Sequence, residues 1–84
     1  MKKIDYIIKD DTYTDLKTGV EIINNRMFTV WADEEMKSVI EGVEGVLETY
    51  NTFNKNEFSV YFDIRYNREE IKQEVAKAIM EKVG

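Results

Sequence analysis

The chain contains no cysteine, no histidine and no proline among its 84 residues. Without cysteine it can form neither a disulfide scaffold nor a thiolate nucleophile, and without histidine it lacks the usual general base near neutral pH. The same two absences remove the thiolate and imidazole ligands of zinc, copper and haem sites. We therefore expect no enzymatic activity, no catalytic residues, no metal site and no cofactor.

Long apolar runs are missing as well. Asp5 and Lys9 interrupt the N-terminal segment before it could serve as a secretory signal, and no stretch of the chain is apolar for long enough to predict a transmembrane helix. The 4 glycines match neither the dinucleotide-binding nor the P-loop spacing. We expect a cytoplasmic protein with no membrane segment.

The charge balance is acidic. Asp and Glu number 17 against 12 Lys and Arg, which gives a net charge of −5, and the basic residues are scattered along the chain. Nucleic-acid binders need a clustered cationic surface, so we expect no direct contact with nucleic acid. The content of 43% hydrophobic and 35% charged residues is typical of a globular domain, and the length is enough for one core. Residues 1–84 are therefore expected to form a single domain.

The N-terminal third predicts strands. Ile4, Tyr6 and Ile8 alternate with other side chains and predict a first strand, whereas the polar stretch 10–15 predicts a solvated loop. That stretch lacks the ligand order and the glycine of a calcium loop.

The triplet Asn24-Asn25-Arg26 separates two apolar runs and predicts a hairpin turn. A two-residue loop would pair Ile22 with Met27. We favour a three-residue loop, which pairs Ile22 with Phe28 and sends Met27 and Trp31 to the opposite face of the sheet.

A helix is predicted to begin after Asp33, with Asp33 as its N-cap. Its apolar face follows helical spacing at Met36, Val39, Ile40 and Val43. The same spacing continues to Phe53, so a long helix is one alternative. Because Gly42 and Gly45 would each cost a helix about 1 kcal/mol, we favour a break near Gly45 and a strand from about 46 to 53.

The C-terminal part predicts a second hairpin and a second helix. Residues 54–56 form the turn, and the strand after it has an apolar face of Phe58, Val60, Phe62 and Ile64 and an opposite face of Ser59, Tyr61, Asp63 and Arg65. Asn67, with Glu70 three residues later, is typical of a helix N-cap. The core face of this helix is predicted at Ile71, Val75, Ala78, Ile79 and Val83, its water-facing side at Arg68, Glu69, Lys72, Gln73, Lys77 and Glu81, and its end at Gly84.

These elements predict a two-layer α+β sandwich in the order β-ββ-α-ββ-α, with an antiparallel sheet of four to five strands and two helices on one face. A right-handed crossover places the strand from Phe58 between its two flanking strands. The result is a permuted ferredoxin-like sheet, whose final strand has moved to the front of the chain. The alternative order, β-ββ-α(long)-β-α, has the long first helix.

The run from Gly45-Val46 through Val60-Tyr61-Phe62-Asp63 to Glu70-Ile71 and Ala78-Ile79 resembles the second half of heavy-metal-associated domains. That family carries a Cys-x-x-Cys metal motif where this chain has Ala32-Asp33-Glu34-Glu35. The resemblance therefore implies a fold and no metal function.

The sheet face away from the helices is the predicted binding surface. Trp, Tyr, Arg and Met are enriched in protein interfaces, and the candidate residues are Met27, Thr29, Trp31, Tyr61, Asp63 and Arg65. We expect a non-enzymatic interaction module with a protein partner, most simply a second copy of the chain in a homodimer. One alternative is an acidic phage or mobile-element effector that blocks a basic nucleic-acid-enzyme groove, with Glu34, Glu41, Glu44 and Glu48 along a long helix. A small-ligand sensor is the third.

Overall fold

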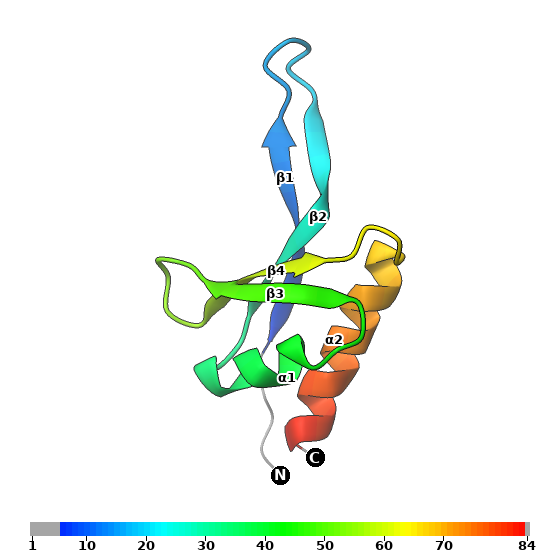
Figure 1. Ribbon diagram of the computed structural model, residues 1–84. Helices are drawn as coiled ribbons and strands as arrows, with labels where there is room; N and C mark the ends of the chain where they lie inside the picture. Colours follow the sequence, from blue (N-terminus) through cyan, green and yellow to red (C-terminus); the bar gives the residue numbers. More distant parts are fainter. Residues whose placement is uncertain (1–5, 84) are drawn as a thin grey trace.

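The computed structural model describes residues 6–83 and contains four strands and two helices (Figure 1). The strands are β1 (Ile7–Thr14), β2 (Glu21–Trp31), β3 (Val46–Asn51) and β4 (Glu57–Phe62). A 3-10 turn at Glu34–Met36 leads into the short helix α1 (Lys37–Glu41), and the chain continues to the long helix α2 (Arg68–Val83).

All four strands belong to one antiparallel sheet in the order β1-β2-β4-β3. β4 lies between β2 and β3, as the predicted crossover requires. With β1 taken as the displaced last strand, this is the strand order of a ferredoxin-like sheet. The predicted α+β class and permuted order are therefore confirmed.

The hydrophobic core lies between the sheet and the two helices. Phe28, Val30, Phe58 and Val60 are fully buried, as are Ile40 of α1 and Val75 and Ile79 of α2. Buried and exposed residues alternate along β4, as expected for a strand with one face on the core. Both helices thus cover the same face of the sheet.

The hairpin predicted at Asn24-Asn25-Arg26 is wrong, because β2 runs without interruption through these residues. The partner of β2 is instead β1, which extends through most of the stretch predicted as a solvated loop. Ile4 and Asp5 of the predicted first strand lie outside the described residues.

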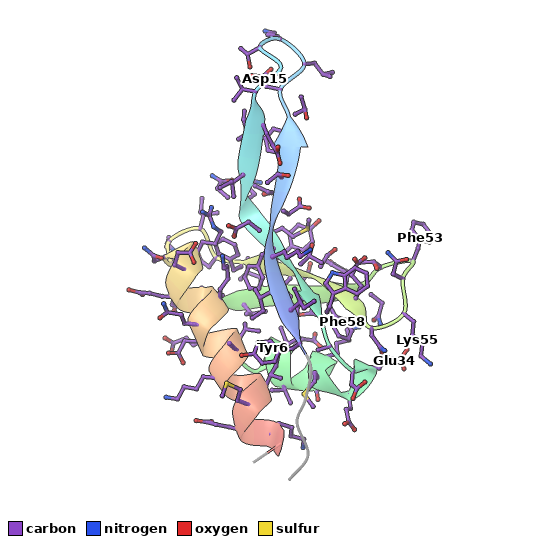
Figure 2. All side chains as sticks on the ribbon, turned by 180° about the vertical axis from the view of Figure 1, so that it is seen from behind. Tyr6, Asp15, Glu34, Phe53, Lys55 and Phe58 are labelled. Carbon is purple, nitrogen blue, oxygen red and sulfur yellow. The ribbon has the colours of Figure 1, made fainter. Side chains whose placement is uncertain are left out.

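The turn between β1 and β2 is organised by Asp15, which lies at the far tip of the hairpin in Figure 2. Its amide donates to the Val20 carbonyl at 2.9 Å, and its carboxylate accepts from the Lys17 amide at 2.9 Å. Gly19 has a φ of +71°, a conformation that glycine adopts without strain. The sequence feature that indicates this hairpin is therefore the pair of turn residues Asp15, at the start of the turn, and Gly19, near its end.

The two asparagines mark an irregularity in β2 instead of a turn. The Asn24 side chain accepts from the Arg26 amide at 2.9 Å and donates to the Asp11 carboxylate at 3.3 Å. The pairing register between β1 and β2 shifts at this point, between Asp10 and Thr12. Beyond the shift, residues 11–25 extend away from the body as a two-stranded hairpin, called the arm below (Figure 1).

The first helix ends at Glu41, so the predicted break near Gly45 is confirmed and the long-helix alternative is wrong. Gly45 has a φ of +96°, which no helix contains. Asp33 occupies the expected position before the first turn, but its side chain makes no capping hydrogen bond, contrary to the prediction.

β4 ends at Phe62, three residues before the predicted end at Arg65. Ile64, which was predicted in the core, is 58% exposed, because the chain turns after Phe62. The Asn67 cap is confirmed, since its side chain accepts from the amides of Glu69 and Glu70. The side chain of Val83 and all of Gly84 lie outside what the structure describes.

Helix α2 is tied to β1 by charged groups. The carboxylate of Asp10 points to the helix side of the sheet and lies 2.9 Å from Lys72 Nζ and 3.2 Å from Arg68 Nε. Lys72 and Arg68 were predicted to face water and instead hold this carboxylate. A charge that points inward on an edge strand also discourages uncontrolled strand pairing there.

Candidate functional site

The sheet has a second face, called the outer face below, which neither helix covers. Because paired residues of adjacent strands point to the same side, the ladder pairs identify its members. They form three rows across the sheet, with Ile7, Trp31 and Glu57 in the first, Lys9, Thr29, Ser59 and Tyr50 in the second, and Met27, Tyr61 and Glu48 in the third. β1 lies beside β2 at the edge of the sheet and does not fold over this face.

Large aromatic side chains are exposed on the outer face. Trp31 is 36% exposed, Tyr61 38% and Tyr50 49%. The rings of Tyr50 and Tyr61 pack edge to face with centroids 5.6 Å apart. Aromatic groups held rigidly on a strand lose little conformational entropy when a partner covers them, so this face is suited to binding protein.

Four of the six predicted site residues lie together on the outer face, namely Met27, Thr29, Trp31 and Tyr61. Their orientation follows from the alternation along a continuous β2, with Phe28 and Val30 buried between them. The predicted orientation of Trp31 is therefore right, although the hairpin used to derive it is wrong.

The other two predicted residues, Asp63 and Arg65, lie in the turn after β4. They do not continue the face of the strand. Arg65 Nη2 lies 2.6 Å from Asp63 Oδ2, and the Arg65 amide donates to Asp63 Oδ1 at 3.0 Å. Both residues line a shallow groove of about 710 Å³ at the end of the outer face, together with Arg26, Leu47, Glu48, Tyr61, Phe62 and Ile64. They thus border the candidate surface at the base of the arm.

The Arg65 side chain and amide, both donating to Asp63, lower the pKa of that carboxyl to about 2. A carboxyl with a lowered pKa in the folded state stabilises the fold above its unfolded pKa. This contribution is therefore complete above about pH 4 and is lost as the pH falls toward 2.

Replacing Arg65 with glutamine should raise the pKa of Asp63 toward the ordinary aspartate value. Carboxyl chemical shifts followed by NMR through an acid titration measure this directly. Lys77→Gln, which removes a cation elsewhere on the surface, is the control and should leave the Asp63 titration unchanged. An Asp63 pKa near 2 in the Arg65→Gln protein would contradict the assignment.

Five outer-face residues were not predicted from the sequence, namely Ile7, Lys9, Glu48, Tyr50 and Glu57. The Tyr50 hydroxyl donates to the Glu48 carboxylate, and this bond raises the pKa of the Tyr50 phenol. The strand containing Glu48 and Tyr50 was predicted, but its faces could not be assigned without the position of its bulge between Val46 and Glu48. Tyr50 could only have been placed from its pairing with Ser59.

A second groove, of about 540 Å³, lies between the end of α1 and α2. Its lining includes Glu44, Glu70, Glu74, Glu81 and the cation Lys77. The glutamates predicted to share one side of a long helix are not aligned, because Glu34 lies in the 3-10 turn, Glu41 ends α1 and Glu48 belongs to β3. This specific support for the acidic-effector alternative is therefore lost.

With this geometry established, comparison with known proteins adds no relative, because the chain matches no protein-family model and has no significant match among curated proteins or solved structures. Within residues 6–83, no three His, Cys, Asp or Glu side chains are grouped so that they could hold a metal ion. Neither described helix combines the length and apolar character needed to cross a membrane. Any functional inference therefore starts from the surface of the chain itself.

Proposed function

We propose that this domain is a non-enzymatic, cytoplasmic protein-interaction module that associates with a second copy of itself through the outer face. The observation that carries the proposal is the set of Trp31, Tyr50 and Tyr61, which are exposed on the one sheet face without helices. Burying a side chain as large as tryptophan stabilises a protein or complex by about 2 to 3 kcal/mol relative to leaving it exposed to water. A partner that covers the face recovers this free energy.

The distribution of charge on the outer face favours a second copy as that partner. The centre of the face is neutral, with Met27, Thr29 and Ser59, and its charged residues are Lys9, Glu48 and, at the end of β4 in the first row, Glu57. Lys9 is on the edge strand β1, and Glu48 is on the opposite edge strand β3. Such a face is complementary to itself, because a two-fold axis can bring the positive edge of each copy against the negative edge of the other.

The decisive variant is Trp31→Ala. We expect it to weaken dimerisation by about 2 kcal/mol or more, because each dimer loses two aromatic anchors. Sedimentation equilibrium over a range of protein concentrations measures the association constant, and circular dichroism checks the fold. In the parent protein the single tryptophan is also a probe, and its fluorescence should shift to the blue as the concentration rises and the ring becomes covered.

Met80→Ala is the matched control. Met80 is 61% exposed on α2, on the opposite side of the molecule, so its truncation should leave both association and folding unchanged. Two results would contradict the proposal. One is a parent protein that remains monomeric at every accessible concentration, and the other is a Trp31→Ala protein that is unfolded or that associates as before.

A further inference from the structure

We infer that the two copies pack their outer faces with the two-fold axis along the strands, so that β1 of each copy lies over β3 of the other and the two arms project from the same end. This inference rests on the proposed function, and it adds the register and the direction of the interface. It follows from the position of the charges in the three rows of the outer face.

The geometry of stacked sheets leaves two arrangements. Sheets that pack face to face in the aligned class keep their strand directions within about 30° of each other. A two-fold axis between two such sheets then runs either along the strands or across them. An axis along the strands, placed between β2 and β4, stacks β1 on β3 and β2 on β4. An axis across the strands stacks every strand on its own copy.

The charged side chains distinguish the two arrangements. Lys9 and Tyr50 occupy the two ends of the same row, because Lys9 pairs with Thr29, Thr29 with Ser59, and Ser59 with Tyr50. A rotation about an axis along the strands leaves each row in place. It therefore puts the Lys9 ammonium over the partner's Tyr50, whose hydroxyl is bonded to the Glu48 carboxylate.

This contact is favourable in two ways and occurs twice in the dimer. An ammonium over a tyrosine ring gains a cation–π interaction, and the carboxylate beside the ring supplies the opposite charge. An axis across the strands that passes through this row would instead bring the two β1 strands together, with Lys9 facing the partner's Lys9. Like charges at an interface are unfavourable, so the axis along the strands is preferred.

The uncharged residues fit the same axis. With rows preserved and β2 over β4, Met27 lies over the partner's Tyr61, and Thr29 lies over the partner's Ser59. A thioether against an aromatic ring is a favourable contact, and two small hydroxyl side chains at the centre allow the sheets to approach closely. In the first row, Trp31 lies over the partner's Glu57, whose carboxylate accepts hydrogen bonds from Thr52 and Asn54 of its own chain. The second and third rows then give the interface a small-residue and apolar centre, with charged contacts at both edges.

The direction of the axis determines where the arms lie. The arm continues β1 and β2 beyond the body of the domain, and the sheet is twisted so that β3 and β4 run across the arm in Figure 1. Rotation about an axis along the mean strand direction leaves the arm of each copy at the same end, so both arms project from one end of the dimer. Their exposed side chains, Tyr13, Leu16, Val20 and Ile23, would then be presented side by side.

A distance between arm tips tests the direction of the axis. The chain has no cysteine, so Lys17→Cys places a single spin label on each tip. For arms at the same end we expect about 15 to 30 Å between labels in pulsed electron paramagnetic resonance, from sheets about 10 Å apart and strands about 4.8 Å apart. For arms at opposite ends the separation should exceed about 50 Å, because the longest dimension of one copy is 49 Å.

Charge exchange tests the register. Lys9→Glu and Glu48→Lys should each weaken dimerisation about ten-fold, because each puts like charges together at both edges. The double variant Lys9→Glu/Glu48→Lys restores opposite charges and should return to within about three-fold of the parent. Lys77→Glu changes the net charge as Lys9→Glu does, but on α2, and should leave the dimer unchanged.

The outcomes separate this inference from the proposed function. A short label distance with rescue by the double variant supports the axis along the strands. A dimer that Trp31→Ala weakens, but whose label distance exceeds about 50 Å or whose association constant Lys9→Glu leaves unchanged, overturns the inference and leaves the proposed function standing. A protein that is monomeric throughout overturns both.

Discussion

Replacing Gly45 with alanine should destabilise the fold by about 3 to 5 kcal/mol, the sum of a strained backbone and an overpacked contact. A Cβ atom at this position would lie 2.4 Å from Ile71 Cδ1 and 3.0 Å from the Tyr66 ring. Ile71 is a core residue with 2% exposure and cannot move freely, and the φ of +96° is unfavourable for alanine. A domain of this size has a total stability of only about 4 to 12 kcal/mol, so the variant should be close to unfolded.

Gly42→Ala is the matched control for that prediction. Gly42 follows the last residue of α1 with a φ of −79°, and an added Cβ would be 3.5 Å from its nearest neighbour, an ordinary contact. We expect a change of less than about 1 kcal/mol, in either direction. Urea denaturation of the two single variants measures both values. Equal effects at the two glycines, or a small effect at Gly45, would contradict the role given to Gly45.

The contrast between the two glycines shows what could be predicted here from sequence. Helix propensity alone treats Gly42 and Gly45 alike, and it was enough to predict that the helix ends near them. It could not show which glycine is required. That depends on Ile71 and Tyr66, which approach Gly45 from a part of the chain more than twenty residues away.

The error in the first half of the chain has a different origin. The Asn-Asn pair and the Asp15 to Gly19 segment are both turn signals, and local propensity ranks the asparagines higher. Tertiary pairing decides between them. β2 pairs with β1 on both sides of Asn24–Arg26, at Glu21–Ile23 and at Phe28–Trp31, so a turn at Asn24–Arg26 would divide this ladder.

The candidate surface was predicted in part. The alternation along two strands was enough to place Met27, Thr29, Trp31 and Tyr61 on one face. Side chains alternate between the two faces of a strand whatever turn precedes it, so the error in the connecting turn did not affect this prediction. The end of β4 was not predictable in this way. Alternation extended the strand to Arg65, whereas the hydrogen bonds between Asp63 and Arg65 stabilise a turn there instead. Lys9 and Glu48 determine the direction of the two-fold axis in the proposed dimer. Their places on the outer face could be assigned only once the order of the strands in the sheet was known.

Replacing each of the two phenylalanines of the β3–β4 hairpin with alanine should change the free energy of unfolding by very different amounts. Phe58 is fully buried against the helices, whereas Phe53 projects into solvent from the tip of the hairpin (Figure 2). Phe58→Ala removes a buried ring and leaves a cavity, so we expect a loss of about 3 to 5 kcal/mol. Phe53→Ala removes a ring that touches little, and we expect a change within about 0.5 kcal/mol.

The same substitution in the same hairpin makes this pair a test of the β3–β4 register. The turn at residues 54–56 puts Phe58 opposite Asn51 and inside the sandwich. A register displaced by one residue would turn Phe58 to the outer face and Ser59 to the core. Thermal and urea denaturation at a protein concentration low enough to keep the chain monomeric measure the two variants without a contribution from association. If the Phe58→Ala protein were as stable as the Phe53→Ala protein, β4 would be displaced by one residue. Ser59 would then face the core, and the row that places Lys9 and Tyr50 together on the outer face would be wrong.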